Sequence, residues 1–154
     1  MNKEEDKLLV RKIEKGTVID HIPRGLGLVI YKLLGIKEET CVVLINVESK
    51  KFGRKDIIKI ENKELSQEDI HKIALLAPNA TINIIRNWEV VEKKKVETPE
   101  ILIGILRCPN SKCITRNESG IETKFIVERK EPIILRCFYC ERTFVRDDFD
   151  ELMK

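Results

Sequence analysis

The segments Cys108-Pro109-Asn110-Ser111-Lys112-Cys113 and Cys137-Phe138-Tyr139-Cys140 decide how the last third of the chain folds. Each brings two thiols together, with four residues between them in the first segment and two in the second. Two such pairs are the usual ligands of a tetrahedral structural zinc site, and four thiolates leave no open position for hydrolytic chemistry. We predict one structural Zn²⁺ that stabilises a domain too small to bury an adequate core. Its ligands are Cys108, Cys113, Cys137 and Cys140.

Two other uses of these cysteines are weighed against the metal site. Disulfides need an oxidising compartment, and residues 1–6 do not resemble a signal peptide. A redox pair of the thioredoxin type lies at a strand-to-helix junction, whereas residues 137–140 lie between strand-like segments. A structural metal is therefore favoured over both. The fifth cysteine, Cys41, begins an apolar segment and is predicted to be a buried core thiol.

Length and composition limit the classes of protein that the chain can belong to. Its 154 residues fit two small domains better than one large one. The net charge is only +3, which does not indicate a nucleic-acid binder. No apolar segment approaches the ~20 residues that a membrane helix needs. We therefore expect a soluble, cytoplasmic protein that binds neither nucleic acid nor a membrane.

The first hundred residues alternate between strand and helix patterns. Strands are predicted over 8–13, 17–22, 41–47, 55–60, 80–85 and 88–91, because β-branched and apolar residues alternate or dominate there. A helix is predicted over 24–34, and a second helix begins at the N-cap Ser66 and is closed by Pro78. Without the first strand the order is β-α-β-β-α-β, which is typical of a ferredoxin-like antiparallel sheet.

The two halves of the chain are separated by a charged segment. Residues 92–99 are rich in Lys and Glu and end near Pro99, which suits a linker. Beyond it, short strands are predicted around the cysteines, over 101–106, 123–127, 132–135 and 143–146. We predict an α+β fold in which a ferredoxin-like sheet with two helices, residues 1–97, precedes a small all-β, zinc-ribbon-like domain, residues 98–154.

A few polar and aromatic residues of the first domain could bind a ligand. Asp20 and His21 lie at the end of a strand just before a helix, where a carboxylate can accept from ribose hydroxyls and an imidazole can donate to phosphate. Lys59 and Lys93 could bind an anion from the sheet, and Trp88 could stack on a base. Each of these residues could equally be a solvated or packing side chain. The first domain has no catalytic Ser/His/Asp set, no glycine-rich phosphate loop and no acidic metal cluster, so we expect no enzyme activity.

Several segments in order along the chain resemble the regulatory chain of aspartate carbamoyltransferase. They are Thr17-Val18-Ile19-Asp20-His21-Ile22-Pro23, Gly53-Arg54-Lys55-Asp56-Ile57-Ile58-Lys59-Ile60-Glu61-Asn62, Ala77-Pro78-Asn79-Ala80-Thr81-Ile82-Asn83, Trp88-Glu89-Val90-Val91 and the two cysteine segments. The resemblance implies a non-catalytic subunit with two domains. In this family the N-terminal domain binds CTP as an inhibitor and ATP as an activator, and the zinc domain docks onto the catalytic chain. A homodimer through the N-terminal sheet is expected.

The resemblance also implies a set of nucleotide-binding residues. Asp20 and Lys59 contact the ribose and base region, while His21 and Lys93 contact phosphates. The site is completed by residues that line it or offer backbone groups to the base: Arg11, Ile13, Lys55, Asn83 and Val90. Trp88 stands where the family commonly has Tyr, and the larger ring of Trp88 could change the preference for the base.

Two other functions compete with this interpretation. A zinc-ribbon nucleic-acid-binding protein would need a basic stripe on the second domain, but its Lys and Arg residues are interleaved with Glu118, Glu122, Glu128 and Glu131. A small enzyme of ferredoxin-like fold would need an acid/base or nucleophile set, which the sequence lacks.

Overall fold

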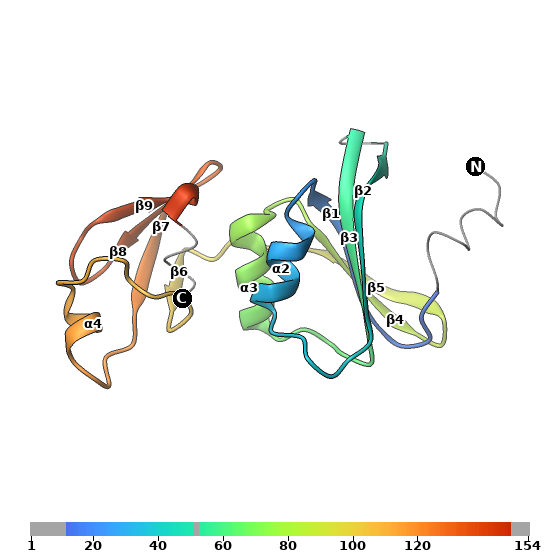
Figure 1. Cartoon of the computed structure of the whole chain (residues 1–154), viewed down its shortest axis with the longest axis horizontal. Helices are drawn as coiled ribbons and strands as arrows, with labels where there is room; N and C mark the ends of the chain where they lie inside the picture. Colours follow the sequence, from blue (N-terminus) through green and yellow to red (C-terminus); the bar gives the residue numbers. More distant parts are fainter. Residues whose placement is uncertain (1–11, 51–52, 149–154) are drawn as a thin grey trace. The chain divides into compact units, whose positions relative to one another are not determined.

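The structure of the chain is a computed structural model that describes residues 12–50 and 53–148 (Figure 1). By its internal contacts the chain divides into two compact units. The first unit comprises the described residues up to Leu65 together with Asn79–Lys95, and the second comprises Ser66–Pro78 with the described residues from Val96 onward. No helix of this part of the chain is long and apolar enough to cross a membrane.

The first unit is built on a five-stranded antiparallel sheet in the order β2-β3-β1-β4-β5. Its strands are β1 (Gly16–Pro23), β2 (Cys41–Ser49), β3 (Gly53–Glu61), β4 (Thr81–Arg86) and β5 (Glu89–Lys95). The helix α2 (Gly27–Leu33) contacts β2 and β3 and inserts Ile30, which is fully buried. Strands β4-β1-β3-β2 have the spatial order of a ferredoxin-like sheet, and β5 extends it. The predicted α+β fold class is confirmed.

The alternation of side chains along the strands separates a core face from a second face. Ile19 of β1 lies opposite Ile58 of β3 and Ile82 of β4, and all three are buried. The preceding residue of β1, Val18, lies opposite Lys59 and Asn83. Since successive side chains of a strand point to opposite faces, the isoleucines form the core on one face, and polar groups gather on the other.

Helix α2 is shorter than the predicted helix over 24–34. Gly25 has a φ of 91°, a left-handed conformation that a right-handed helix cannot include. The backbone N–H groups of Gly25 and Gly27 both donate to the carboxylate of Asp56, at 3.0 and 2.8 Å. The chain is therefore held in a turn before the helix begins.

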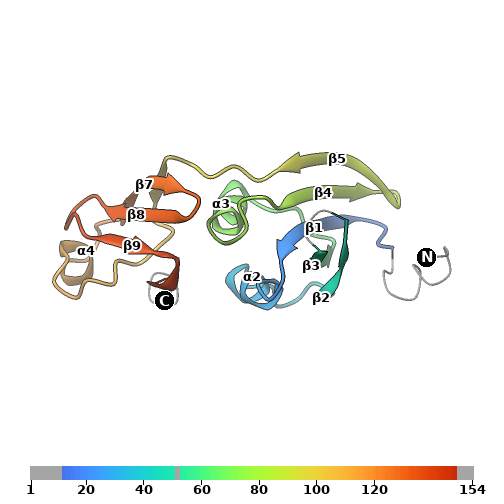
Figure 2. The ribbon, with the colours of Figure 1, turned by 90° about the horizontal axis from the view of Figure 1, so that it is seen from above.

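The hairpin of β4 and β5 corrects the predicted linker (Figure 2). Asn87 and Trp88 both have positive φ, 51° and 69°, the conformation of a two-residue type I′ turn. Strand β5 then continues to Lys95, whose backbone lies opposite Thr81, so residues 92–95 belong to the sheet and not to a linker. Charged side chains suit this position because β5 is an edge strand that would otherwise invite pairing with another chain.

The strand predicted over 8–13 and the predicted burial of Cys41 are the remaining expectations for the first unit. The strand predicted over 8–13 falls mostly outside the described residues, and Lys12 and Ile13 lie in no strand. Cys41 is half-buried and not the buried core thiol that was predicted, because it begins β2 at the edge of the sheet.

The second unit contains a four-stranded antiparallel sheet in the order β6-β7-β8-β9. Its strands are β6 (Ile101–Ile103), β7 (Lys124–Lys130), β8 (Ile133–Cys137) and β9 (Thr143–Val145). Leu102, Phe125, Leu135 and Phe144 are buried in its core. The short helix α4 (Ile114–Asn117) and the 3₁₀ turn η1 (Arg146–Asp148) were not predicted.

Helix α3 (Gln67–Leu76) begins as the sequence predicts. Ser66 is its N-cap and forms a capping box with Asp69, in which each side chain bonds to the other residue's backbone N–H. By sequence this helix lies in the predicted first domain, whereas its contacts group it with the second unit. The predicted domain boundary after residue 97 therefore stays a prediction.

Candidate functional site

The four predicted metal ligands lie together in the second unit. The sulfur atoms of Cys108, Cys113, Cys137 and Cys140 are all within 4.8 Å of one another. Close approaches join the two cysteine segments: Cys108 Sγ is 3.7 Å from Cys140 Sγ, and Cys113 Sγ is 3.8 Å from Cys137 Sγ. The cluster is therefore one four-sulfur site and not two separate pairs.

Two tight turns aim the thiols at a common point. In the first, the Cys113 N–H donates to the Asn110 carbonyl at 2.9 Å, and Cys113 then caps α4. In the second, the Glu141 N–H donates to the Cys137 carbonyl at 2.9 Å, and Glu141 has a φ of 62°. The second turn is tied to the sheet because the Phe138 N–H donates to the Lys124 carbonyl.

The protonation of the four thiols depends on whether a cation is bound among them. Burial raises the pKa of the Cys108 and Cys137 thiols, so these sulfurs stay protonated without a positive partner. The pKa of Cys140 is lowered to about 7, because burial, which raises it, is outweighed by hydrogen bonds from the Asn110 side chain and the Arg142 backbone. A divalent ion would deprotonate all four thiols. None of the described cysteines forms a disulfide.

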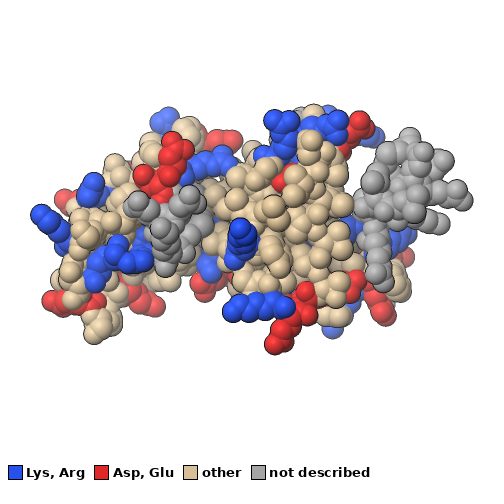
Figure 3. Space-filling model, viewed as in Figure 1, with Lys and Arg blue, Asp and Glu red and all other residues tan. Residues whose placement is uncertain are grey.

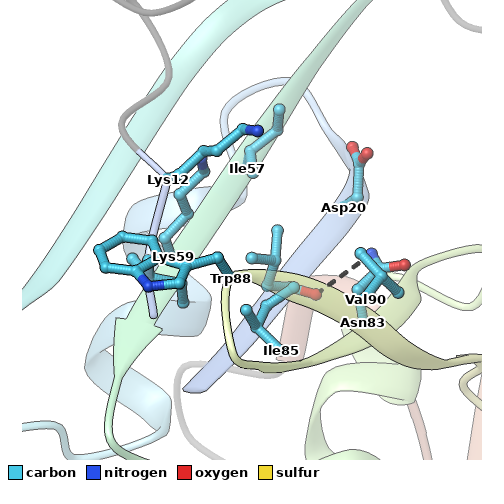
Figure 4. A pocket seen from close by; sticks show the side chains of 10 residues that line it. Lys12, Asp20, Ile57, Lys59, Asn83, Ile85, Trp88 and Val90 are labelled. Carbon is cyan, nitrogen blue, oxygen red and sulfur yellow. Dashed lines mark hydrogen bonds between the residues drawn. The ribbon is translucent and has the colours of Figure 1, made fainter. Parts of the chain in front are cut away.

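A second candidate site is a cavity of about 370 Å³ in the first unit (Figure 4). It opens on the sheet face that bears Val18, Lys59 and Asn83, opposite the isoleucine core. In Figure 4, Lys12, Lys59 and Trp88 lie towards one side of the cavity and Asp20 and Asn83 towards the other. Its full lining is Lys12, Ile13, Val18, Asp20, Ile57, Lys59, Asn83, Ile85, Trp88 and Val90.

Six of the ten predicted nucleotide-binding residues line this cavity: Ile13, Asp20, Lys59, Asn83, Trp88 and Val90. Three others border the same face without lining the cavity. Lys55 forms an ion pair with Asp20 at 2.9 Å, and Lys93 lies opposite Asn83 in the sheet. The N–H of His21 donates to Asp20, and its Nδ1 is 2.9 Å from the Thr81 hydroxyl. Arg11 lies outside the described residues.

The position of His21 results from a bulge in β1. The register of β1 against β3 shifts between Ile19 and Ile22, and His21 within this bulge has a φ of 59°. The bulge breaks the alternation of side chains along the strand, so the side chains of both Asp20 and His21 can lie near the sheet face that bears the cavity. A sequence pattern of β-branched residues does not reveal such a bulge.

Lys59 has an unusual environment for a lysine. Its side chain is only 7% exposed, and burial lowers its pKa while the nearby Asp20 raises it. A lysine is almost never so buried without a partner for its charge. A largely buried ammonium that opens on a cavity can hold an anionic ligand by charge-assisted hydrogen bonds.

Sequence reasoning missed Lys12 as a lining residue of the cavity. Lys12 reaches the cavity because the Trp88 N–H donates to the Glu14 carbonyl at 3.0 Å and so joins the β4–β5 turn to the segment before β1. This contact joins residues far apart in the sequence, and no local pattern distinguishes Lys12 from its neighbour Lys15. The apolar lining residues Val18, Ile57 and Ile85 were missed because they look like ordinary strand residues.

The face of the second unit that Figure 3 shows has no continuous basic stripe among its described residues. On the face shown in Figure 3, basic and acidic side chains of this unit are interspersed outside the grey atoms. Arg136 of this unit is paired with Glu128. Alternating charge of this kind gives weak attraction for a polyanion.

Comparison with known proteins gives matches over most of the chain. Residues 8–97 match the family model described as aspartate carbamoyltransferase regulatory chain, allosteric domain, and residues 100–150 match the metal binding domain of the same chain. The aspartate carbamoyltransferase regulatory chain of Thermococcus sibiricus is 54% identical over 89% of this chain and 91% of its own. Those of Pyrococcus horikoshii and Methanopyrus kandleri are 52% and 51% identical, over 92% and 96% of this chain and 95% and 96% of their own.

Proposed function

The chain belongs to the family of aspartate carbamoyltransferase regulatory chains, the non-catalytic chains of that enzyme, and we propose that it binds nucleotide effectors and docks onto the catalytic chain. The effectors are CTP, ATP or related nucleotides, and their site is the cavity of the first unit. The metal of the second unit is one Zn²⁺. The function implies a regulatory-chain homodimer within a larger enzyme, and a cytoplasmic location.

The observation that carries the nucleotide proposal is the composition of one cavity. A carboxylate on Asp20 can accept from ribose hydroxyls, and Lys59 supplies a cation. Apolar side chains and the Trp88 indole offer a flat surface for a base. The volume, about 370 Å³, is within the range of small-molecule sites. Lys55 and Lys93 on the same face provide further positive charge for a triphosphate.

The geometry of the cysteine cluster supports zinc. Four sulfurs at a typical Zn–S distance form a tetrahedron with edges of about 3.8 Å. The sulfur separations Cys108–Cys140 and Cys113–Cys137 are 3.7 and 3.8 Å. Thiolate ligands favour Zn²⁺ over Mg²⁺ and Ca²⁺, which bind oxygen. When bound, the ion supplies no chemistry to a substrate and instead joins the two turns of the second unit.

Regulation requires that a nucleotide bind two states of the enzyme with different affinity. In this proposal the nucleotide alters the first unit and its dimer contact. The second unit transmits the resulting preference for one state of the enzyme to the catalytic chain. A coupling of about 1–3 kcal/mol is typical of such systems. A small change of contacts around the cavity is therefore sufficient.

The nucleotide site is tested by replacing Lys59 with methionine, which keeps the length of the side chain and removes its charge. We expect the Lys59→Met chain to bind CTP and ATP about ten- to a hundredfold more weakly, because a hydrogen bond to a charged group is lost. Isothermal titration calorimetry measures the affinity. The matched control is Lys94→Met on the exposed strand β5, away from the cavity lining, which leaves the affinity unchanged. Equal affinity in the wild type and Lys59→Met would rule out this cavity as the site.

Docking is tested by mixing the zinc-loaded chain with the purified catalytic chain. We expect the two to co-elute in size-exclusion chromatography. Adding CTP or ATP then shifts the aspartate saturation curve of the complex, while the catalytic chain alone is insensitive to nucleotide. If neither co-elution nor a shift occurs with zinc present, the proposed function is wrong.

A further inference from the structure

The sulfur atoms of the cluster receive hydrogen bonds from groups outside the ligand set. Cys108 accepts from the backbone N–H of Asn110, and Cys137 accepts from the backbone N–H groups of Tyr139 and Cys140. Cys140 accepts from the Asn110 side chain and the Arg142 backbone. Most of these donors are backbone groups, which the turn geometry supplies regardless of side chain.

The hydrogen-bond partner of the Cys113 sulfur outside the ligand set is a side-chain hydroxyl. Thr115 Oγ1 lies 3.1 Å from Cys113 Sγ. Thr115 is the second residue of α4, whose N-cap is Cys113 itself. The contact thus depends on a side-chain hydroxyl at this position and on the short helix that the sequence did not predict.

The surroundings leave this hydroxyl directed at the sulfur. A threonine in a helix often donates to a backbone carbonyl of the preceding turn instead. Here two nearby carbonyls, of Ser111 and Cys113, already accept from the side-chain amide of Asn117, at 3.0 and 2.8 Å. The Cys113 carbonyl also accepts the backbone N–H of Arg116 at 2.9 Å. Asn117 therefore already bonds to the Ser111 carbonyl, the acceptor four residues before Thr115, while the Thr115 hydroxyl lies at hydrogen-bond distance from the Cys113 sulfur.

The direction of the hydrogen bond follows from the chemistry of a metal-bound cysteine. Without a metal either atom can donate. A thiolate that ligates a metal has no proton, so the hydroxyl of Thr115 must then be the donor. A divalent ion with four thiolates has a net charge of −2, and each hydrogen bond to a sulfur disperses part of that charge. Groups that bond to metal ligands in this way orient them and strengthen metal binding.

We propose that Thr115 is a positioning residue of the metal site, which acts through Cys113 to slow the release of the metal and to set the electronic environment of that sulfur. This inference rests on the proposed metal site. The spacing of the four cysteines in the sequence does not indicate this role for Thr115.

The test compares Thr115→Val, which keeps the shape of the side chain but removes the hydroxyl, with Thr115→Ser, which keeps the hydroxyl. Zinc release from the full-length chain into excess chromophoric chelator is followed at fixed pH. We expect Thr115→Val to release zinc roughly tenfold faster than the wild type, and Thr115→Ser to release it at nearly the wild-type rate. Thr143→Val, on the exposed side of β9, is the matched control and leaves the rate unchanged.

A spectroscopic readout separates this role from a merely structural one. In the cobalt-loaded chain the sulfur-to-metal charge-transfer band reports the electron density on the thiolates. Loss of the hydrogen bond raises that density, so the band of Thr115→Val moves to longer wavelength, and Thr115→Ser restores it. Thr115→Ala serves as a second hydroxyl-free variant should the valine form fail to fold.

Two outcomes would overturn the inference in distinguishable ways. Wild-type release rates and an unshifted band in the hydroxyl-free variants would refute the role of Thr115 and leave the metal site standing. A wild-type chain that binds neither zinc nor cobalt would refute the metal site itself, and the inference with it.

Discussion

Replacing Cys137 with serine is expected to abolish the ordered fold of the second unit. Cys137 is fully buried at the end of β8, and its sulfur lies among the other three. Removal of one thiolate weakens metal binding severely, and in a small metal domain the free energy of metal binding is also folding free energy, on the order of 10 kcal/mol. We therefore expect the Cys137→Ser chain to lose its metal and the thermal transition of this unit.

Circular dichroism and metal analysis of the purified full-length chain measure both effects. Removal of the ion from the wild type with a chelator should reproduce them and release the catalytic chain from a preformed complex. The matched control is Cys41→Ser, because Cys41 is a half-buried cysteine at a sheet edge outside the cluster. A Cys137→Ser chain with wild-type metal content and melting curve would show that the cluster does not hold a structural ion.

The meeting of the four cysteines in one cluster could be predicted from the sequence because the spacing within each pair is local. Each pair of cysteines lies in one tight turn, so the sequence distance nearly fixes the distance in space. Thr115 could not be found in this way. Its role depends on α4, a helix of four residues, Ile114–Asn117, that is too short to produce a periodic pattern.

The sheet of the first unit was predictable in its strands but not in its irregularities. The β-branched runs indicate β1 and β3 directly, and Ile19 and Ile58 pair as core residues. The end of β5 was misplaced because its Lys-rich sequence resembles a linker, while an edge strand tolerates the same residues. The cavity was half predicted: its polar residues were named, but Lys12 joins them through a contact between distant segments.

Asp56 was not singled out by the sequence, although the structure gives it a central position in the first unit. Asp56 lies beside Arg54 and Lys55 in a charged segment, and an aspartate is ordinarily exposed. In the structure Asp56 is fully buried. One carboxylate oxygen accepts from Gly25 and Gly27, and the other accepts from the Asn46 N–H at 2.9 Å. A single side chain thus joins the turn before α2 to Asn46, which has a φ of 61° where the register of β2 against β3 shifts.

We expect Asp56→Ala to destabilise the first unit by about 3–5 kcal/mol, since three backbone donors lose a charged acceptor in a buried site. Asp56→Asn keeps one acceptor oxygen, but its NH2 group cannot accept from the remaining backbone N–H groups. The stability of this variant should therefore lie between those of Asp56→Ala and the wild type. Glu64→Ala is the matched control: this carboxylate of the first unit also accepts a hydrogen bond, from Arg86, but both side chains are exposed, so the loss should be small.

Urea denaturation followed by tryptophan fluorescence measures this difference, because Trp88 is the single tryptophan and lies in the first unit. The same variant should also bind nucleotide more weakly, since Asp56 is flanked in β3 by Lys55, which pairs with Asp20, and by Ile57, which lines the cavity. A chain with Asp56→Ala that unfolds at the wild-type urea concentration would mean that water or a shifted backbone replaces the carboxylate. In that case the turn before α2 would not depend on this side chain, and the geometry of the cavity would have to be maintained by the sheet alone.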